Sequence, residues 1–233
     1  MKVVALIPAF NEADFIVQTL TAVSELEHVD EIVVIDDGSD DDTFALASSA
    51  SVGKDVRVAR LQANQGKGAA LNYGRHEVQA QVYLLLDADL GATASLAGAL
   101  LTPILQDEAD MTIARFAADQ SASKAKMGFG AVRCIAQLGV KWLTGGSITS
   151  PLSGQRAVRA EVLQALGDFS SGFGVEVGLT VGALHHGFRL VEVPLAMKHR
   201  AYGRGLRGLR HRGRQLFHVL RTFMRCWQRG WHR

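Results

Sequence analysis

Cysteine and proline are scarce in this sequence, and the shortage of each excludes a class of protein. Cys134 and Cys226 are the only cysteines among 233 residues, and their separation matches no metal-binding or redox spacing. A small secreted scaffold built on disulfides is therefore excluded, and a reducing, cytoplasmic compartment is expected. With four prolines and 21% charged residues, the composition is also unlike that of a disordered chain.

Long apolar runs are missing as well. No uninterrupted apolar run reaches the roughly 20 residues that a membrane-spanning helix requires. The apolar residues after Met1 read as a strand and not as the core of a signal peptide. What the chain does have is a hydrophobic content of 48%, which is enough for one sizeable domain with its own core.

Acidic residues are absent from the final part of the chain. Glu192 is the last of them, and residues 198–233 contain 11 of the 25 Lys and Arg residues. The rest of the chain therefore has 14 basic residues against 23 acidic ones. A tail with such an excess of positive charge is expected to meet an anionic partner, such as phosphate groups or a membrane surface.

The basic tail also has a regular apolar pattern. Its large apolar residues recur at steps of three, four or seven, which predicts a basic amphipathic helix over 206–233. Two uses of this helix stay open: it docks on the body of the protein or on a second subunit of a homodimer, or it lies on the inner face of a membrane. Nucleic acid is not expected as a partner, because the body is acidic and carries no recognition motif. The apolar positions are Leu209, Leu216, Leu220, Phe223, Met224, Trp227 and Trp231.

Strand and helix patterns alternate through the first hundred residues. Apolar runs of strand length are separated by segments with helical spacing, which predicts an α/β fold with a mostly parallel, Rossmann-like sheet flanked by helices. Ligands of such sheets bind beyond the carboxyl ends of the strands. The predicted strands cover 2–7, 31–37, 56–61 and 82–86, and the predicted helices cover 14–26, 42–51 and a segment that begins near Ala69.

Helical patterns dominate after residue 110. They predict helices over 126–143 and 157–166, a further helix that ends at Leu184, and a short strand over 189–193. No internal repeat or linker separates this part from the first hundred residues. We therefore expect one domain over 1–205, followed by the tail helix over 206–233.

The segment Asp87-Ala88-Asp89 follows the fourth predicted strand. Two carboxylates on either side of a small residue can converge on one ligand where the chain turns. Carboxylate oxygens suit Mg²⁺ or Mn²⁺, which proteins usually hold through one or two carboxylates together with substrate phosphates. Such an ion can neutralise a diphosphate leaving group, so the segment predicts a metal–diphosphate centre.

Two further polar segments fall at the same predicted edge of the sheet. Pro8-Ala9-Phe10-Asn11-Glu12 follows the first strand, and Asp36-Asp37-Gly38-Ser39 follows the second. Taken singly, each has an ordinary explanation, because Asn11 is a good helix cap and Asp37-Gly38 is a common turn pair. Their shared position at strand ends favours one binding site. The nearby Gly66-Lys67-Gly68 is not a Walker loop, because the G-x-x-x-x-G-K-[ST] pattern is absent.

In this order, the motifs resemble those of the family 2 glycosyltransferases, which have the GT-A fold. The resemblance rests on P-A-F-N-E, D-D-G-S, N-x-G-K-G-A-A-L-N-Y-G and D-A-D, and it covers roughly residues 1–200. Within the family, the chain is similar to the dolichol-phosphate mannosyltransferase-like branch. It is also similar to the glucosyl-3-phosphoglycerate synthases, through Gly172-Phe173-Gly174-Val175-Glu176 and a late histidine.

The resemblance implies a role for each matching position. Asp89 and His199 would bind Mg²⁺ or Mn²⁺, His199 as a neutral imidazole, and Asp89 and Glu176 would be the catalytic carboxylates. The residues implied in nucleotide binding are Pro8, Ala9, Asn11, Glu12, Asp37, Lys67, Asp87 and Ala88.

The acceptor side is implied by Ser153-Gly154-Gln155-Arg156-Ala157. This segment resembles the S-G-F-R-A of the polyprenyl-phosphate branch, except that Gln155 replaces the aromatic residue. A guanidinium can hold a phosphate through two hydrogen bonds, although either arginine could instead pair with the acidic body. The acceptor-binding candidates are Ser153, Gly154, Arg156 and Arg200.

The resulting hypothesis is a metal-dependent transfer of sugar from a nucleoside-diphosphate sugar, by preference a UDP-sugar. The acceptor would carry a phosphate, as polyprenyl phosphate or a small phosphorylated metabolite does. One alternative is a sugar nucleotidyltransferase, although the glycine-rich N-terminal loop of those enzymes is absent. The other is a non-catalytic, membrane-associated relative that binds nucleotide, against which Asp89 and His199 argue.

Overall fold

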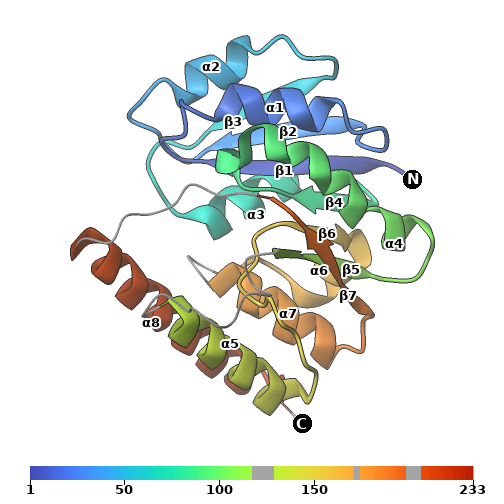
Figure 1. Cartoon of the computed structure of the whole chain (residues 1–233), viewed down its shortest axis with the longest axis vertical. Coiled ribbons are helices and arrows are strands. Elements are labelled where there is room, and N and C mark those ends of the chain that lie inside the picture. Colours follow the sequence, from blue (N-terminus) through green and yellow to red (C-terminus); the bar gives the residue numbers. More distant parts are fainter. Residues whose placement is uncertain (117–128, 171–173, 198–205, 233) are drawn as a thin grey trace.

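The computed structural model of the protein describes residues 1–116, 129–170, 174–197 and 206–232. Within these residues, seven strands form one sheet in the order β3-β2-β1-β4-β6-β5-β7, and helices cover both of its faces (Figure 1). The α/β class and the mostly parallel sheet predicted from the sequence are confirmed.

The first half of the chain alternates strand and helix as predicted. β1 lies between β2 and β4 and is parallel to both, and β2 is parallel to β3. These parallel pairs bring the carboxyl ends of four strands to one edge of the sheet. The elements are β1 (Val3–Ala9), α1 (Ile16–Ser24), β2 (Glu31–Asp36), α2 (Thr43–Ser49), β3 (Val56–Arg60), α3 (Lys67–Glu77) and β4 (Val82–Leu85).

The second half departs from the predicted pattern at two strands. β5 was not predicted, and β6 falls where a helix was predicted from Ala157, so that the helix begins at Ala160. β6 is antiparallel to β4 and to β5, whereas β5 and β7 are parallel. The elements are β5 (Met111–Phe116), α5 (Phe129–Thr144), β6 (Arg156–Arg159), α6 (Ala160–Leu166), α7 (Val175–His185), β7 (Leu190–Leu195) and α8 (Leu206–Gln228).

The chain between β4 and β5 forms η1 (Ala88–Leu100), a 3-10 helix, and α4 (Thr102–Leu105). Among the described residues, Ala88–Leu105 is the one helical stretch that is long and apolar enough to cross a membrane, contrary to the expectation from the sequence. That is weak evidence for a span, because Gly91 interrupts the helical backbone with φ 53° and ψ −143°. The buried side chains of the stretch also pack into the core beside α1. We therefore describe it as a core segment.

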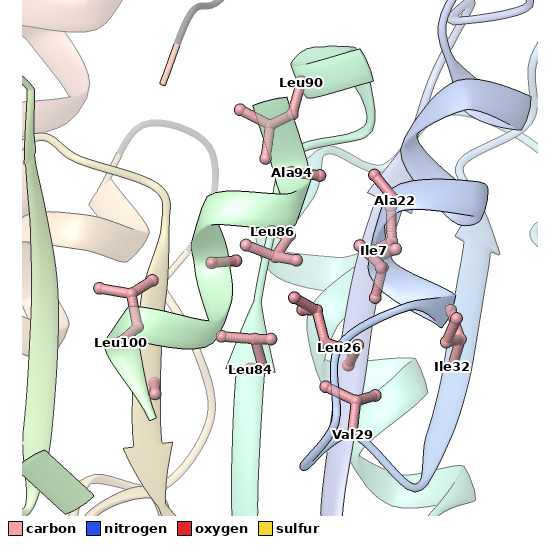
Figure 2. Packing of buried hydrophobic residues seen from close by; sticks show 14 of the residues in the cluster. Ile7, Ala22, Leu26, Val29, Ile32, Leu84, Leu86, Leu90, Ala94 and Leu100 are labelled. Atoms are coloured by element: carbon pink, nitrogen blue, oxygen red, sulfur yellow. The ribbon is translucent and has the colours of Figure 1, made fainter. Parts of the chain in front are cut away.

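The core consists of two clusters, one on each face of the sheet. Successive side chains of a strand point to opposite faces, so Val3 and Ile7 of β1 join one cluster and Val4 and Leu6 join the other. The first cluster contains α1 and η1, and the second contains α3, α5, α6 and α7. Figure 2 shows the first cluster, in which Ile7, Ala22, Leu26, Val29, Ile32, Leu84, Leu86, Leu90, Ala94 and Leu100 are labelled.

The tail helix α8 lies beside α5 and packs against α5 and α7, on the side of the sheet that these helices cover (Figure 1). Its side chains Val219, Thr222 and Cys226 are buried, and Val219 and Cys226 belong to the same hydrophobic cluster as α5 and α7. One side of the helix is thus docked on the body of the protein, as the first of the two sequence interpretations states.

Candidate active site

The first two motifs are tied together at the carboxyl ends of β1 and β2. The backbone N–H of Asp37 donates to the carbonyl oxygen of Ala9 at 2.8 Å. Asn11 has a left-handed backbone (φ 56°), which asparagine tolerates better than most residues. Its N–H donates to Ser39 Oγ at 2.9 Å, and its Oδ1 accepts the N–H of Asp40 at 2.9 Å. Asn11, predicted to bind nucleotide, therefore also joins the two loops.

The neighbouring candidates line this junction. Pro8 is half-buried at the end of β1, and Ala9 is buried. The N–H of Glu12 donates to Thr43 Oγ1 at 2.8 Å, which attaches the loop after β1 to the start of α2. The structure thus gathers Pro8, Ala9, Asn11 and Glu12 at one edge of the sheet, as the sequence predicted.

Asp37 fixes the loop that leads into α3. Its carboxylate is buried and accepts the backbone N–H groups of Gln65 at 2.8 Å and Gly66 at 2.7 Å. α3 begins at the next residue, Lys67. The carboxylate of Asp37 therefore sets the position of the lysine side chain on the first turn of the helix.

Four side chains from distant parts of the chain meet beyond β4. Lys67 Nζ lies 2.6 Å from Asp87 Oδ1 and 2.8 Å from Glu176 Oε1, and forms an ion pair with each. Gln155 Nε2 donates to the second oxygen, Asp87 Oδ2, at 2.6 Å. We call Lys67, Asp87, Gln155 and Glu176 the central cluster. It joins α3, the end of β4, the segment before β6 and the first turn of α7.

The central cluster determines the charge of Lys67. Burial alone would lower the pKa of its ammonium group. The negative charges and hydrogen bonds of Asp87 and Glu176 outweigh burial, however, and hold the pKa of Lys67 above its ordinary value. The lysine is therefore a fixed positive charge between two carboxylates throughout the neutral range.

Gly154 lies directly against the central cluster. A Cβ atom at this position would be 2.6 Å from both Asp87 Oδ2 and Lys67 Nζ, so a side chain cannot fit without moving them. The adjacent Ser153 is buried, and its Oγ donates to Gln155 Oε1 at 3.4 Å. The structure thus brings two predicted acceptor residues, Ser153 and Gly154, to the same place as Asp87.

Gln155 is a site residue that sequence reasoning missed. The sequence showed it only as a departure from an aromatic pattern, and its partner Asp87 is 68 positions away. The exchange of an aromatic residue for a buried amide was the one available signal, because a buried amide requires hydrogen-bond partners.

Arg156 does not have the acceptor-facing position that was predicted for it. Its guanidinium is fully buried and donates to the carbonyl oxygens of Ser153 and Pro151, both at 2.9 Å, and to Thr180 Oγ1 at 2.9 Å. Burial lowers the pKa of Arg156 to about 10, despite the opposing charge of Glu176. The prediction of a phosphate contact is wrong, because the donors point into the protein and fasten the segment before β6 to α7.

Asp89 lies on the first turn of η1, and its Oδ1 atom is buried. The preceding residue, Ala88, is held by a hydrogen bond from Thr19 Oγ1 to its carbonyl oxygen at 2.8 Å. No three His, Cys, Asp or Glu side chains in the described residues form a group that could hold a metal ion by itself. One carboxylate completed by diphosphate oxygens is nevertheless a donor set that Mg²⁺ and Mn²⁺ accept. The predicted ligand His199 and the predicted acceptor residue Arg200 lie outside the described residues.

Asp87 is less suited to the metal than Asp89. Both of its carboxylate oxygens accept short hydrogen bonds from the central cluster, one from Lys67 and one from Gln155. A metal ion on Asp87 would have to compete with an ammonium for the same oxygen. The sequence-based division, in which Asp89 takes the metal and Asp87 takes the nucleotide, stays a prediction.

Comparison with known proteins extends this description. The sequence profile of Glycosyl transferase family 2 matches residues 4–159. A glucosyl-3-phosphoglycerate synthase of Mycobacterium tuberculosis is 30% identical over 190 residues, which are 75% of this chain. The chain spans 58% of the length of that relative. An uncharacterized protein of Methanocaldococcus jannaschii is 30% identical over 203 residues, which are 83% of this chain and 80% of that protein.

Comparison with solved structures finds the same Mycobacterium tuberculosis protein. The glucosyl-3-phosphoglycerate synthase of Mycobacterium tuberculosis in complex with Mn²⁺, UDP-glucose and phosphoglyceric acid matches with a TM-score of 0.75 at 26% identity. The match covers 95% of this chain and 79% of the other. The same protein in complex with Mg²⁺ and UDP has a TM-score of 0.74 at 24% identity, which shows the shared fold.

Proposed function

The chain belongs to glycosyl transferase family 2, and from this premise we propose that it transfers glucose from UDP-glucose to a small phosphorylated acceptor of the phosphoglycerate type, with Mn²⁺ or Mg²⁺ as cofactor. The observation that carries the proposal is the central cluster. It holds Asp87 at the end of β4, two residues before Asp89, by contacts from both halves of the chain.

The leaving group of such a reaction is a diphosphate, whose charge must be neutralised as the sugar departs. A divalent ion bound to Asp89 would act there as a Lewis acid. Each carboxylate oxygen of Asp87 can accept more than one hydrogen bond, so Asp87 could bind ribose hydroxyl groups in addition to Lys67 and Gln155. Asp37, which is buried directly after β2, would help to orient the base through the loop that its carboxylate holds at Gln65 and Gly66.

Glu176 is the carboxylate placed opposite β4. Its Oε1 atom accepts a hydrogen bond from the ammonium group of Lys67 at 2.8 Å. The side chain of Glu176 is almost fully buried on the first turn of α7. The second oxygen can accept a hydrogen bond from a hydroxyl of the transferred sugar or of the acceptor. Because α7 is fixed to the segment before β6 through Arg156 and Thr180, this carboxylate is held rigidly.

Two features support a small phosphorylated acceptor over polyprenyl phosphate. The Mycobacterium tuberculosis relative is named for phosphoglycerate and has been solved with phosphoglyceric acid. In addition, Gln155 stands where the polyprenyl-phosphate branch has an aromatic residue, and its side chain points inward to Asp87.

The proposal is tested by measuring release of the nucleoside diphosphate, which is UDP or GDP according to the donor. The purified protein is given UDP-glucose, UDP-N-acetylglucosamine or GDP-mannose, each with 3-phosphoglycerate, polyprenyl phosphate or no acceptor, and with Mn²⁺, Mg²⁺ or EDTA. We expect the fastest release with UDP-glucose, 3-phosphoglycerate and a metal, and we expect EDTA to abolish it.

The Asp89→Ala variant shows whether the activity belongs to this protein or to a contaminating enzyme. Asp89→Ala should lower the rate about 100-fold or more, because loss of several kcal/mol of charge stabilisation corresponds to that factor. Asp40→Ala, which changes an exposed carboxylate in the nearby turn, is the matched control and should keep its activity. Absence of nucleoside diphosphate release with every donor, or an unchanged rate in Asp89→Ala, would contradict the proposal.

A further inference from the structure

An exposed apolar surface lies across α5 and α8, on the side of both helices that faces away from the sheet. Met224 and Trp142 are 61% and 66% exposed, and the other members are between 47% and 61% exposed. We call this set the α5–α8 face. Its members are Leu138, Trp142, Phe217, Leu220, Met224 and Trp227.

The α5–α8 face is continuous from one helix to the other. Its members recur at steps of three or four along each helix, so they form one row on α5 and one on α8. The two rows meet where Trp142 and Trp227 stack, with ring centroids 5.0 Å apart and planes 8° apart. His232 stacks on Trp227 at 4.3 Å. Two tryptophans that are stacked and exposed are unusual on a surface that has no partner.

The opposite side of α8 fixes it in place. Gly139 of α5 leaves room for the ring of Phe223, and Gly174 at the start of α7 leaves room for Thr222. A Cβ atom at either glycine would overlap these side chains. Because this side holds α8 on the body, the exposed residues Phe217, Leu220 and Met224 face away from the contact that docks the helix.

The charged residues of the two helices that carry the α5–α8 face are all of one sign. Neither α5 nor α8 contains an Asp or Glu, while Lys141 and Arg221 are exposed beside the apolar rows. The guanidinium of Arg229 lies 5.0 Å from the ring of Trp231 nearby. The rest of the chain carries an excess of acidic residues, so the positive charge is concentrated at this side of the molecule.

We propose that the α5–α8 face binds the surface of a membrane that contains anionic lipids. Apolar side chains would enter the boundary between headgroups and acyl chains, the indole rings would lie at headgroup level, and the basic side chains would meet lipid phosphates. A second copy of the chain fits less well, because a twofold contact through this face would bring Lys141 and Arg221 of both copies together without acidic partners.

The test is co-sedimentation with phospholipid vesicles. The full chain should pellet with vesicles of phosphatidylcholine and phosphatidylglycerol, and it should not pellet with phosphatidylcholine alone. Binding should weaken as salt is raised, because exposed charges are screened. Met224→Asp should lower the partition coefficient at least tenfold, and Arg221→Gln should lower it roughly fivefold, the effect of one basic residue at an anionic surface.

Leu96→Asp is the matched control, since Leu96 of η1 is also exposed (40%) and lies outside the α5–α8 face. It should bind vesicles as the unmodified protein does. Thiol labelling checks that α8 stays docked in each variant: exposed Cys134 should react, and buried Cys226 should not.

Two outcomes would overturn the proposal. One is that the unmodified protein ignores anionic vesicles, or that Met224→Asp binds them as well as the unmodified protein does. The other is seen by light scattering: a dimer that Met224→Asp converts to a monomer, without vesicle binding, would assign the face to a second copy of the chain.

Discussion

The ammonium group of Lys67 joins two carboxylates that belong to different halves of the chain. Asp87 follows β4, and Glu176 belongs to α7, more than eighty residues later. Because all three side chains are largely buried, removing the cation leaves two negative charges close together with little water around them. The stability of the fold and the shape of the nucleotide site therefore depend on the same residue.

Lys67→Met should destabilise the protein by about 3 kcal/mol near neutral pH, as is usual when one partner of a buried ion pair is removed. The pKa of Lys67 is higher in the folded protein than in the unfolded chain. The stabilisation that follows from this shift is fully present at any pH below the pKa of lysine in the unfolded chain, and it is lost only as the pH rises past the pKa of the folded protein. Between about pH 6 and pH 8 the lysine stays charged, so the deficit of Lys67→Met should be constant in that range. Chemical unfolding at several pH values measures the deficit, and a deficit near zero at neutral pH would refute the ion-pair explanation.

Gln155→Leu removes one hydrogen bond to Asp87 and keeps a similar volume. We expect a loss of about 1–2 kcal/mol in stability. We also expect a roughly fivefold weaker binding of UDP, because Asp87 Oδ2 loses the hydrogen bond from Gln155 that fixes its position. Calorimetric titration with UDP and Mn²⁺ gives the affinity. Gln137→Leu is the control, because Gln137 donates to the carbonyl oxygen of Thr149 in an exposed position. Equal effects of the two substitutions would show that Gln155 does not orient Asp87.

Among the single residues of the site, the sequence could predict those that lie in contiguous motifs. Lys67 and Asp87 each belong to a recognisable sequence motif, at the start of a helix and after the end of a strand respectively. Gln155 and Arg156 could not be assigned correctly, because their roles depend on what lies across the sheet from them. Whether the guanidinium of Arg156 points outward to a ligand or inward to Thr180 depends on tertiary packing, which a local sequence motif does not reveal.

Among the elements, β6 shows why the second half was harder to predict. Its four residues, Arg-Ala-Val-Arg, have no alternation that indicates a strand, and they continue directly into α6. They form a strand because β4 pairs with them on one side and β5 on the other. The propensity of so short a segment is overridden by tertiary contacts. β1, β2 and β4, in contrast, consist largely of consecutive apolar residues, and β3 combines valine and alanine with arginine.

α3 offers a test of how closely two elements approach. A Cβ atom on Gly68 would overlap the carbonyl oxygen of Ser170, which belongs to the segment between α6 and α7. In an open helix, Gly→Ala stabilises by about 1 kcal/mol. Here we expect Gly68→Ala to destabilise by about 2 kcal/mol, because a backbone atom has to move. Thermal unfolding measures the sign.

Gly53→Ala is the control for Gly68→Ala. An added Cβ atom at Gly53 meets no atom within 4 Å, so this substitution should leave stability nearly unchanged. Stabilisation by Gly68→Ala would show that α3 and the segment after α6 are further apart than described.

For the whole molecule, the docking of α8 bears on domain organisation. The sequence placed a boundary between residues 205 and 206, but α8 buries side chains in the cluster shared with α5 and α7. We expect the full chain to unfold in one transition and the chain truncated after residue 205 to melt about 10 °C lower. The reason is the loss of about 4 kcal/mol of apolar burial. Calorimetry tests this, and a second transition in the full chain, or an unchanged melting temperature after truncation, would make α8 an independent appendage.

The direction of β6 has one more consequence. Because β6 runs opposite to β4, the segment before β6 reaches the same edge of the sheet as the end of β4, and Leu85 pairs with Arg156. The short stretch from Ser150 to Gln155 therefore meets Asp87 although the two are far apart in sequence. Because Gln155 and Gly154 of this stretch contact Asp87, a new sequence in this one loop would also change how Asp87 is held. In evolution or in the laboratory, the loop and the end of β4 are therefore expected to change together.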